Sequence, residues 1–153
     1  MLKKMLILLV CLLLPLCFVH YTFAADQSIE GLWKTIDDKT GKKKSIVQIY
    51  KQNEKYFGKI IKLFREPDED QNPICDKCAS DDPRKDQPIK GMIILKNLEK
   101  IGNKFKNGTI LDPHNGKVYD CKLWIEDGKL KLRGYILFLY RTQTWLPANP
   151  TEE

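Results

Sequence analysis

The chain has 153 residues and a formal net charge of +6, with 26 lysines and arginines against 20 aspartates and glutamates. This length fits a single domain with a hydrophobic core of its own. The lysines are scattered through turn-like segments and strand-like faces, which indicates a solvated surface and argues against a protein that binds nucleic acid.

The N-terminus is predicted to be a secretory signal peptide, residues 1–24. Two lysines precede a long uncharged apolar run, and the small residues Thr22 and Ala24 suit cleavage by signal peptidase. We expect cleavage near Ala24, leaving a periplasmic or secreted domain of residues 25–153 without a transmembrane segment. An uncleaved anchor and a lipoprotein are the alternatives, although the cysteines of the run lack the small preceding residues of a lipid-attachment site.

Eight strands are predicted in the exported domain, separated by polar or glycine-containing turns. Pro113 and Gly116 lie in one such turn, and Asp127-Gly128 is the strongest short-range signal for a hairpin. The least regular segment is residues 65–87, which is rich in Asp, Pro and Lys. The predicted strands cover residues 31–36, 45–51, 55–64, 91–98, 107–112, 118–126, 129–136 and 140–145.

Alternation between apolar and polar residues is clearest in the last strands. Leu130 and Leu132 share one face of their strand, and Cys121 and Leu123 share one face of the strand before. A period of two is typical of antiparallel sheet with one buried face, and no long stretch has the helical period. We therefore predict an all-β fold: a single antiparallel up-and-down β-barrel of about eight strands, which leaves no sheet edge unpaired.

The three cysteines of the exported domain leave several interpretations open. A disulfide between Cys75 and Cys78 closes a short loop and stabilises by about 2 kcal/mol, whereas a bridge from either to Cys121 would contribute about 4 kcal/mol. Cys121 lies on an inward face and also fits a buried free thiol. Cys75, Cys78, Cys121 and His114 form a possible zinc set, and a redox pair is a further alternative. We expect the Cys75–Cys78 disulfide and no metal.

Two motifs at the ends of the exported domain resemble those of lipocalin-like barrels. Trp33 belongs to a Gly-x-Trp sequence on the first strand, and Arg141 belongs to the last strand. The resemblance implies that Arg141 stacks on the Trp33 indole and closes one end of the barrel, an interaction of roughly 0.5–2 kcal/mol.

The order of motifs resembles DUF2147, a bacterial family of exported proteins of unknown function. The matching segments include GLWKTIDDKTGKKKSIVQIY, CDKC and GTILDPHNGKVYDCKL, and the likeness covers residues 29–145. It implies a lipocalin-like barrel outside the cytoplasm and supplies no reaction and no catalytic residue. The chain departs from the family pattern in the last hairpin, where residues 137–140 (LFLY) replace a glycine-rich step.

The residues themselves favour binding over catalysis. His114 is the only histidine after the predicted signal peptide, and no nucleophile motif or phosphate-binding loop accompanies it. We expect no enzyme and no cofactor, but a small hydrophobic ligand in the barrel. The alternative is a solid core and an envelope-protein partner held by residues 65–87. The candidate ligand-binding residues are Tyr50, Phe57, Ile61, Tyr119, Leu123, Leu132 and Tyr140.

Overall fold

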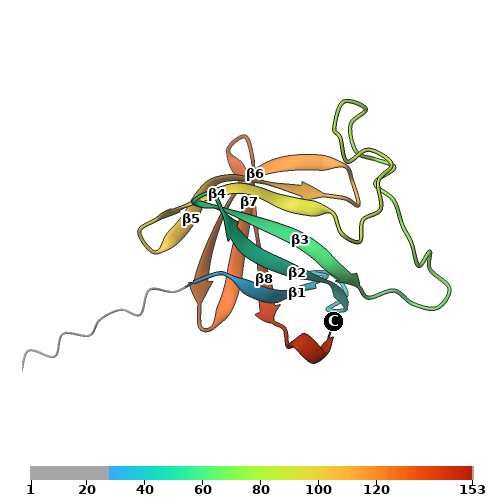
Figure 1. Cartoon of the computed structure of the whole chain (residues 1–153), viewed down its shortest axis with the longest axis horizontal. Coiled ribbons are helices and arrows are strands. Elements are labelled where there is room, and N and C mark those ends of the chain that lie inside the picture. Colours follow the sequence, from blue (N-terminus) through green and yellow to red (C-terminus); the bar gives the residue numbers. More distant parts are fainter. Residues whose placement is uncertain (1–27, 153) are drawn as a thin grey trace, which may run out of the picture.

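The computed structural model describes residues 28–152, which form a closed antiparallel barrel of eight strands (Figure 1). Each strand pairs with the next, and β1 pairs with β8 to close the cylinder. No helix in this part of the chain has the length and apolar character needed to cross a membrane. The strands are β1 (Gly31–Ile36), β2 (Lys43–Gln52), β3 (Lys55–Leu63), β4 (Ile93–Ile101), β5 (Lys104–Asp112), β6 (Lys117–Glu126), β7 (Lys129–Ile136) and β8 (Leu139–Pro147).

Because the topology is up-and-down, the connections alternate between the two ends of the barrel. One end, here called the turn end, holds tight turns at residues 53–54, 102–103 and 127–128. The opposite end, here called the loop end, carries the longer connections. These are residues 37–42, 64–92 and 113–116, together with the tip of the β7–β8 hairpin at residues 137–138. The predicted fold class is confirmed, and all eight expected strands are present.

Side chains from the inner faces of all eight strands fill the barrel. Trp145 is buried opposite Leu130, and Phe105 meets Tyr56 edge to face with ring centroids 4.7 Å apart. Edge-to-face contacts of this kind add to the burial of large apolar side chains. The buried cluster also includes Trp33, Val47, Ile49, Ile60, Leu95, Leu98, Ile110, Cys121, Leu123 and Leu132. The axis of the barrel is therefore occupied by the protein itself.

Irregularities in the ladders decide which face some residues occupy. The β2–β3 register shifts between Ile46 and Val47, so that Val47 lies opposite Ile60 while Ile46 lies opposite Lys62. An extra residue in one strand changes the side on which the following side chains emerge. Ile61 is that extra residue, and it lies between the inward-facing Ile60 and the outward-facing Lys62.

The C-terminal segment folds back over the outside of the barrel. After β8 the chain makes a short 3-10 turn, η1 (Pro150–Glu152), whose Glu152 carboxylate lies 2.5 Å from the Lys34 ammonium of β1. Ile46, which lies beside Lys34 in the ladder, is fully buried yet lies outside the barrel's central cluster. The outer face of β1 and β2 is thus partly covered at the point where the barrel closes.

Candidate functional site

The strands β6 and β7 separate at the loop end of the barrel. Their ladder ends at the pair Asp120–Tyr135, although β6 begins three residues earlier, at Lys117. Lys117 and Val118 pair only with β5, and Ile136 pairs only with β8. The barrel wall therefore opens between the two strands.

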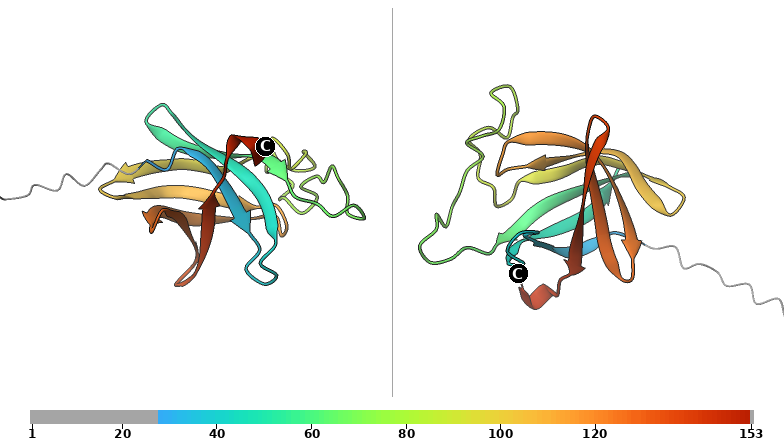
Figure 2. Two further views of the ribbon diagram at one scale, coloured as in Figure 1. Left: turned by 90° about the horizontal axis from the view of Figure 1, so that it is seen from below. Right: turned by 180° about the vertical axis from the view of Figure 1, so that it is seen from behind.

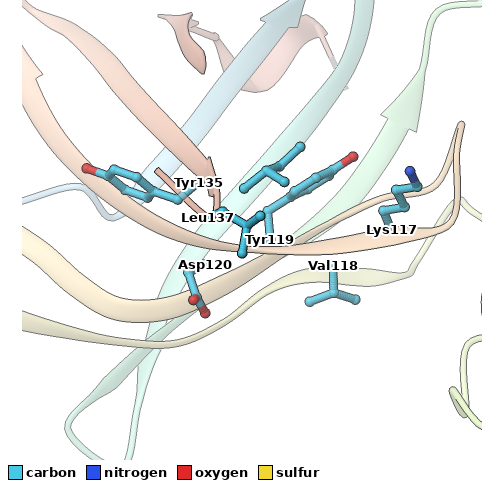
Figure 3. A pocket seen from close by; sticks show the side chains of 7 residues that line it. Lys117, Val118, Tyr119, Asp120, Tyr135 and Leu137 are labelled. Carbon is cyan, nitrogen blue, oxygen red and sulfur yellow. The ribbon is translucent and has the colours of Figure 1, made fainter. Parts of the chain in front are cut away.

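This opening, here called the β6–β7 cleft, has a volume of about 420 Å³. Figure 3 shows its side chains: Tyr119 stands on one side of the β6 ribbon, and Val118 and Asp120 stand on the other. Most of the lining is apolar or aromatic, with one cation and one anion at the edges. The lining residues are Lys117, Val118, Tyr119, Asp120, Tyr135, Ile136 and Leu137.

Tyr119 connects the cleft to the core. Its ring packs partly buried against the central cluster, and a side chain at Gly134 would come within 3.7 Å of the Tyr119 Cβ. The Tyr119 hydroxyl accepts a hydrogen bond of 3.0 Å from the Asn115 side chain in the β5–β6 turn. Tyr119 thus forms the floor of the cleft, with its polar end anchored at the rim.

Cys121, two residues after Tyr119 on β6, is buried inside the barrel. Burial, and to a lesser extent the charge of Asp120, raise the pKa of its thiol to about 12. A thiol with so high a pKa holds almost no thiolate near neutral pH and is a poor nucleophile. Cys121 is a free cysteine and serves here as a small apolar core residue.

The loop between β3 and β4 is closed by a disulfide and seated on the β5–β6 turn. Cys75 and Cys78 are bonded, and the Cys75 sulfur lies 3.9 Å from the Pro113 carbonyl oxygen. Gly116 has a φ of +73°, and a side chain there would collide with the Lys77 carbonyl. Glycine is thus required both by the backbone conformation and by the close approach of the loop.

A partly buried ion pair fixes the other half of this loop. The Arg84 guanidinium donates two hydrogen bonds to the Asp82 carboxylate, of 2.8 and 2.6 Å, and a third of 3.2 Å to the Ile93 carbonyl of β4. The Arg84 hydrogen bonds lower the pKa of Asp82 to about 2. The loop is therefore tied to the barrel by both a covalent and an ionic constraint.

The tip of the β7–β8 hairpin stands out into solvent beside the cleft. Leu137 is 90% exposed, Phe138 is 86% exposed and Leu139 is 62% exposed. Ile136 and Tyr140 are exposed as well, so that five consecutive large apolar side chains lie at the surface. Soluble proteins rarely leave so many adjacent apolar side chains uncovered unless the patch contacts something.

The candidate ligand-binding residues are divided among three places. Leu123 and Leu132 lie in the filled core and Tyr119 lines the cleft. The other four do not line the interior. Tyr50 and Phe57 stack on each other on the outer face, because their neighbours Ile49 and Tyr56 take the inward positions. Ile61 shares the outer face of β3 with Phe57, one residue after the inward-facing Ile60, and Tyr140 lies on the exposed hairpin.

The expected stack of Arg141 on Trp33 is not formed. Trp33 lies opposite Pro147 in the β1–β8 ladder, and Arg141 lies six residues further along β8, which is roughly 20 Å at the rise of a strand. The Trp33 indole instead donates a hydrogen bond of 2.8 Å to the Ile29 carbonyl. Arg141 is 63% exposed and binds Asp38 of the β1–β2 loop. The barrel is closed by its ladder rather than by this pair.

The residues of the alternative zinc set are not assembled. Two of the cysteines are joined in the disulfide, and Cys121 is enclosed in the core. His114 lies in the exposed β5–β6 turn, where its backbone N–H donates to the Asp112 carboxylate. Within residues 28–152, no three His, Cys, Asp or Glu side chains are placed to hold a metal ion. The predicted signal peptide, residues 1–24, lies outside the described residues.

Sequence reasoning missed the cleft and the exposed tip. The signal for the tip was present in the run Tyr135–Tyr140, where six apolar residues cross a position at which a turn was expected. The cleft had no such signal, because it depends on where the pairing of β6 with β7 ends.

Comparisons with known proteins agree with this architecture. The solved structure of protein HP1028 from the human pathogen Helicobacter pylori, described as belonging to the lipocalin family, is similar with a TM-score of 0.68 and 19% identity. The match covers 82% of this chain and 86% of that chain, and it shows a shared fold. A comparison with curated proteins finds no match. The profile of the family described as uncharacterized protein conserved in bacteria, DUF2147, matches residues 31–146, so the chain belongs to DUF2147 and has a lipocalin-like barrel.

Proposed function

We propose that this is an exported binding protein, not an enzyme, that holds a small apolar ligand in the β6–β7 cleft. The observation that carries the proposal is the combination of a filled barrel axis with an apolar opening in the wall beside it. A volume of about 420 Å³ lies within the usual size of small-molecule sites. Export rests on the sequence of residues 1–24, and the low sequence identity to HP1028 supports only the fold.

The chemistry of the lining favours a ligand with an apolar chain and one polar end. Val118, Ile136 and Leu137 offer aliphatic surface, and burying such surface contributes about 25 cal/mol per Å² before the entropic cost of binding. Lys117 stands at the edge of the same cleft, where its ammonium would pair with a carboxylate or phosphate. A fatty-acid-like molecule meets both conditions.

A titration with a fluorescent fatty acid, cis-parinaric acid, tests this proposal. The informative variant is Val118→Asp, which places a carboxylate in the cleft, and its control is Ile101→Asp at the turn end. The two side chains are 46% and 45% exposed, so both variants replace an equally exposed branched aliphatic residue. We expect saturable binding that weakens about tenfold or more in Val118→Asp and not in Ile101→Asp. Equal affinities, or no saturable binding, would exclude the cleft as the site.

The alternative is an envelope protein that recognises a partner through residues 65–87. The favouring observation is that this exposed segment is braced, by the disulfide, the Asp82–Arg84 pair and the Ile74–Pro88 bridge. A loop held in one conformation loses less entropy when it binds. Native mass spectrometry of protein purified from its own envelope separates the two functions, since a retained small molecule supports the first and a co-purifying protein bound to this loop supports the second.

A further inference from the structure

The exposed tip of the β7–β8 hairpin breaks the usual rule for a two-residue turn. Ile136 pairs with Leu139, so Leu137 and Phe138 alone make the turn. Leu137 has a φ of +53°, a conformation that bulky side chains rarely adopt and that hairpin turns usually assign to Gly, Asn or Asp. A strained leucine that is 90% exposed contributes nothing to the core, which points to a role outside the fold.

The side chains change character in order along the hairpin. Leu137 and Phe138 lie at the apex and the Ile136–Leu139 pair follows them, so the outermost layer is wholly apolar. The next layer is the Tyr135–Tyr140 pair, with ring centroids 6.3 Å apart. From the apex toward the barrel, a layer of aliphatic and phenylalanine side chains is therefore followed by a layer of tyrosines.

Cations form the layer after the tyrosines. Arg141 lies one residue beyond Tyr140, and the Arg133 guanidinium lies 4.1 Å from the centre of the Tyr140 ring. At the rise of a strand, the distance from Phe138 to Arg141 is roughly 10 Å. Peripheral proteins bind a bilayer surface in a similar arrangement. Their apolar side chains are buried roughly 5–10 Å into the headgroup and acyl boundary, tyrosine lies at this boundary, and cations lie at the phosphates.

The β1–β2 loop brings further positive charge to the same side. Arg141 binds Asp38 of this loop, and Figure 2 (left) shows the loop and the β7–β8 tip projecting in the same direction. The segments 37–44, 117–122 and 133–141 together contain eight lysines and arginines and three aspartates. Their net charge of +5 exceeds the +4 of residues 25–153, so these three segments carry a strong positive excess.

We propose that the β7–β8 tip inserts into the surface of an anionic phospholipid bilayer, with the surrounding cations bound to lipid headgroups. Charge complementarity favours this occupant, because each lysine or arginine near an anionic surface adds to the attraction. The shape of the tip also favours a bilayer, since a convex apolar apex can be buried only by a partner whose surface deforms to surround it. The docking surface stands whether or not the cleft holds a ligand, but a docked tip would place the cleft, which shares Ile136 and Leu137, beside the acyl chains.

Sedimentation with vesicles tests the proposal, with no other apolar ligand added. We expect the wild type to bind vesicles containing about 30% phosphatidylglycerol, to bind pure phosphatidylcholine much more weakly, and to be released by salt. The double variant Leu137→Asp/Phe138→Asp should lose binding by about 100-fold or more, since burial of both side chains is forfeited. Ile101→Asp, at the turn end, should bind like the wild type.

Charge and depth are tested separately. Lys39→Gln/Lys43→Gln should weaken binding about 30-fold, whereas Lys104→Gln/Lys129→Gln, at the turn end, should not. Brominated acyl chains should quench the added fluorescence of Phe138→Trp, which reports insertion of the apex. Either of two results would overturn the proposal: no binding of the wild type to anionic vesicles, or equal binding by the wild type and Leu137→Asp/Phe138→Asp. A third result would also overturn it. If the wild type forms dimers, binds no vesicles and becomes monomeric in this double variant, the tip is a self-association surface.

Discussion

The two hairpins that share β7 have turns of equal length and opposite character. Asp127 and Gly128 connect β6 to β7 with φ values of +51° and +69°, the conformation and the residues that a tight hairpin turn prefers. Leu137 and Phe138 connect β7 to β8, and Leu137 adopts a φ of +53° without any of the usual turn residues. One turn follows local chemistry, and the other violates it.

The difference in burial shows what each turn serves. Next to the Asp127-Gly128 turn, Leu130 is fully buried and lies opposite Trp145 in the β7–β8 ladder. The turn end is therefore part of the packed core. Next to the other turn, Leu139 is largely exposed and Leu137 touches no core cluster. Proteins break local rules mainly at functional sites, so the loop end is where a function of this barrel should be sought.

The largest effect is expected from matched leucine truncations in the two hairpins. Leu130→Ala leaves a cavity in a fully buried site and should lower the free energy of unfolding by about 2–5 kcal/mol. Leu139→Ala removes the same atoms from an exposed site and should change it by less than about 0.5 kcal/mol. Urea denaturation measures both. Similar losses in the two variants would mean that the tip is packed in solution and that the contrast is wrong.

The disulfide loop sharpens the comparison, because it lies at the loop end yet is held in place. Replacing both bridged cysteines, Cys75→Ala/Cys78→Ala, should cost about 2 kcal/mol, the loop-closure entropy of so short a ring. Reduction of the wild type serves as the control and should give a similar loss in denaturation experiments. If neither treatment changes stability, the loop is held by its contacts with Gly116 and β4 rather than by the bond.

Exchanging the turn residues tests the backbone argument directly. Gly128→Leu forces a bulky residue into the left-handed region and should cost about 1–2 kcal/mol. Leu137→Gly relieves the same strain, but glycine also has greater conformational entropy in the unfolded chain, which offsets part of the gain. The net effect should be to stabilise the folded protein by up to about 1 kcal/mol. Thermal unfolding gives both signs. A loss of stability in Leu137→Gly would show that the leucine side chain supports the fold.

Most of the strands were predictable from the sequence, because they end at turns with recognisable chemistry; the Leu137-Phe138 turn is the exception. The segments 31–36 and 129–136 match β1 and β7 residue for residue. The inner face was predictable only where the period of two continues without interruption, as at Leu130 and Leu132. Tyr50 and Phe57 are predicted inside when only their aromatic character is considered. The alternation of the inward-facing Val47 and Ile49 instead places Tyr50, and with it its ladder partner Phe57, on the outer face.

The candidate site escaped prediction because it depends on relations that a linear sequence does not contain. The cleft exists because the β6–β7 ladder stops at Asp120 while both strands continue. The lysines looked scattered along the chain, and only the fold brings the β1–β2 loop beside Arg141. Similarly, the Gly-x-Trp motif indicated the correct lipocalin-like fold, yet the separation of Trp33 from Arg141 follows from the β1–β8 register.

The remaining effect concerns the ion pair that braces residues 65–87 and depends on pH. The pKa of Asp82 is about 2 in the folded protein against an ordinary value of 3.8, because Arg84 donates hydrogen bonds to the carboxylate. A lowered pKa means that the folded state binds the proton less tightly than the unfolded state, so this contribution to stability is present above about pH 3.8 and is lost as the pH falls through about 2.

Asp82→Asn should therefore be less stable than the wild type at pH 7, and this gap in the free energy of unfolding should narrow as the pH falls toward 2. Urea unfolding at several pH values follows the gap, and a gap independent of pH would mean that the Asp82 charge does not stabilise the loop. The β7–β8 tip has no such brace in its apex, and the exposed Leu139→Ala variant should show the same small difference from the wild type at every pH.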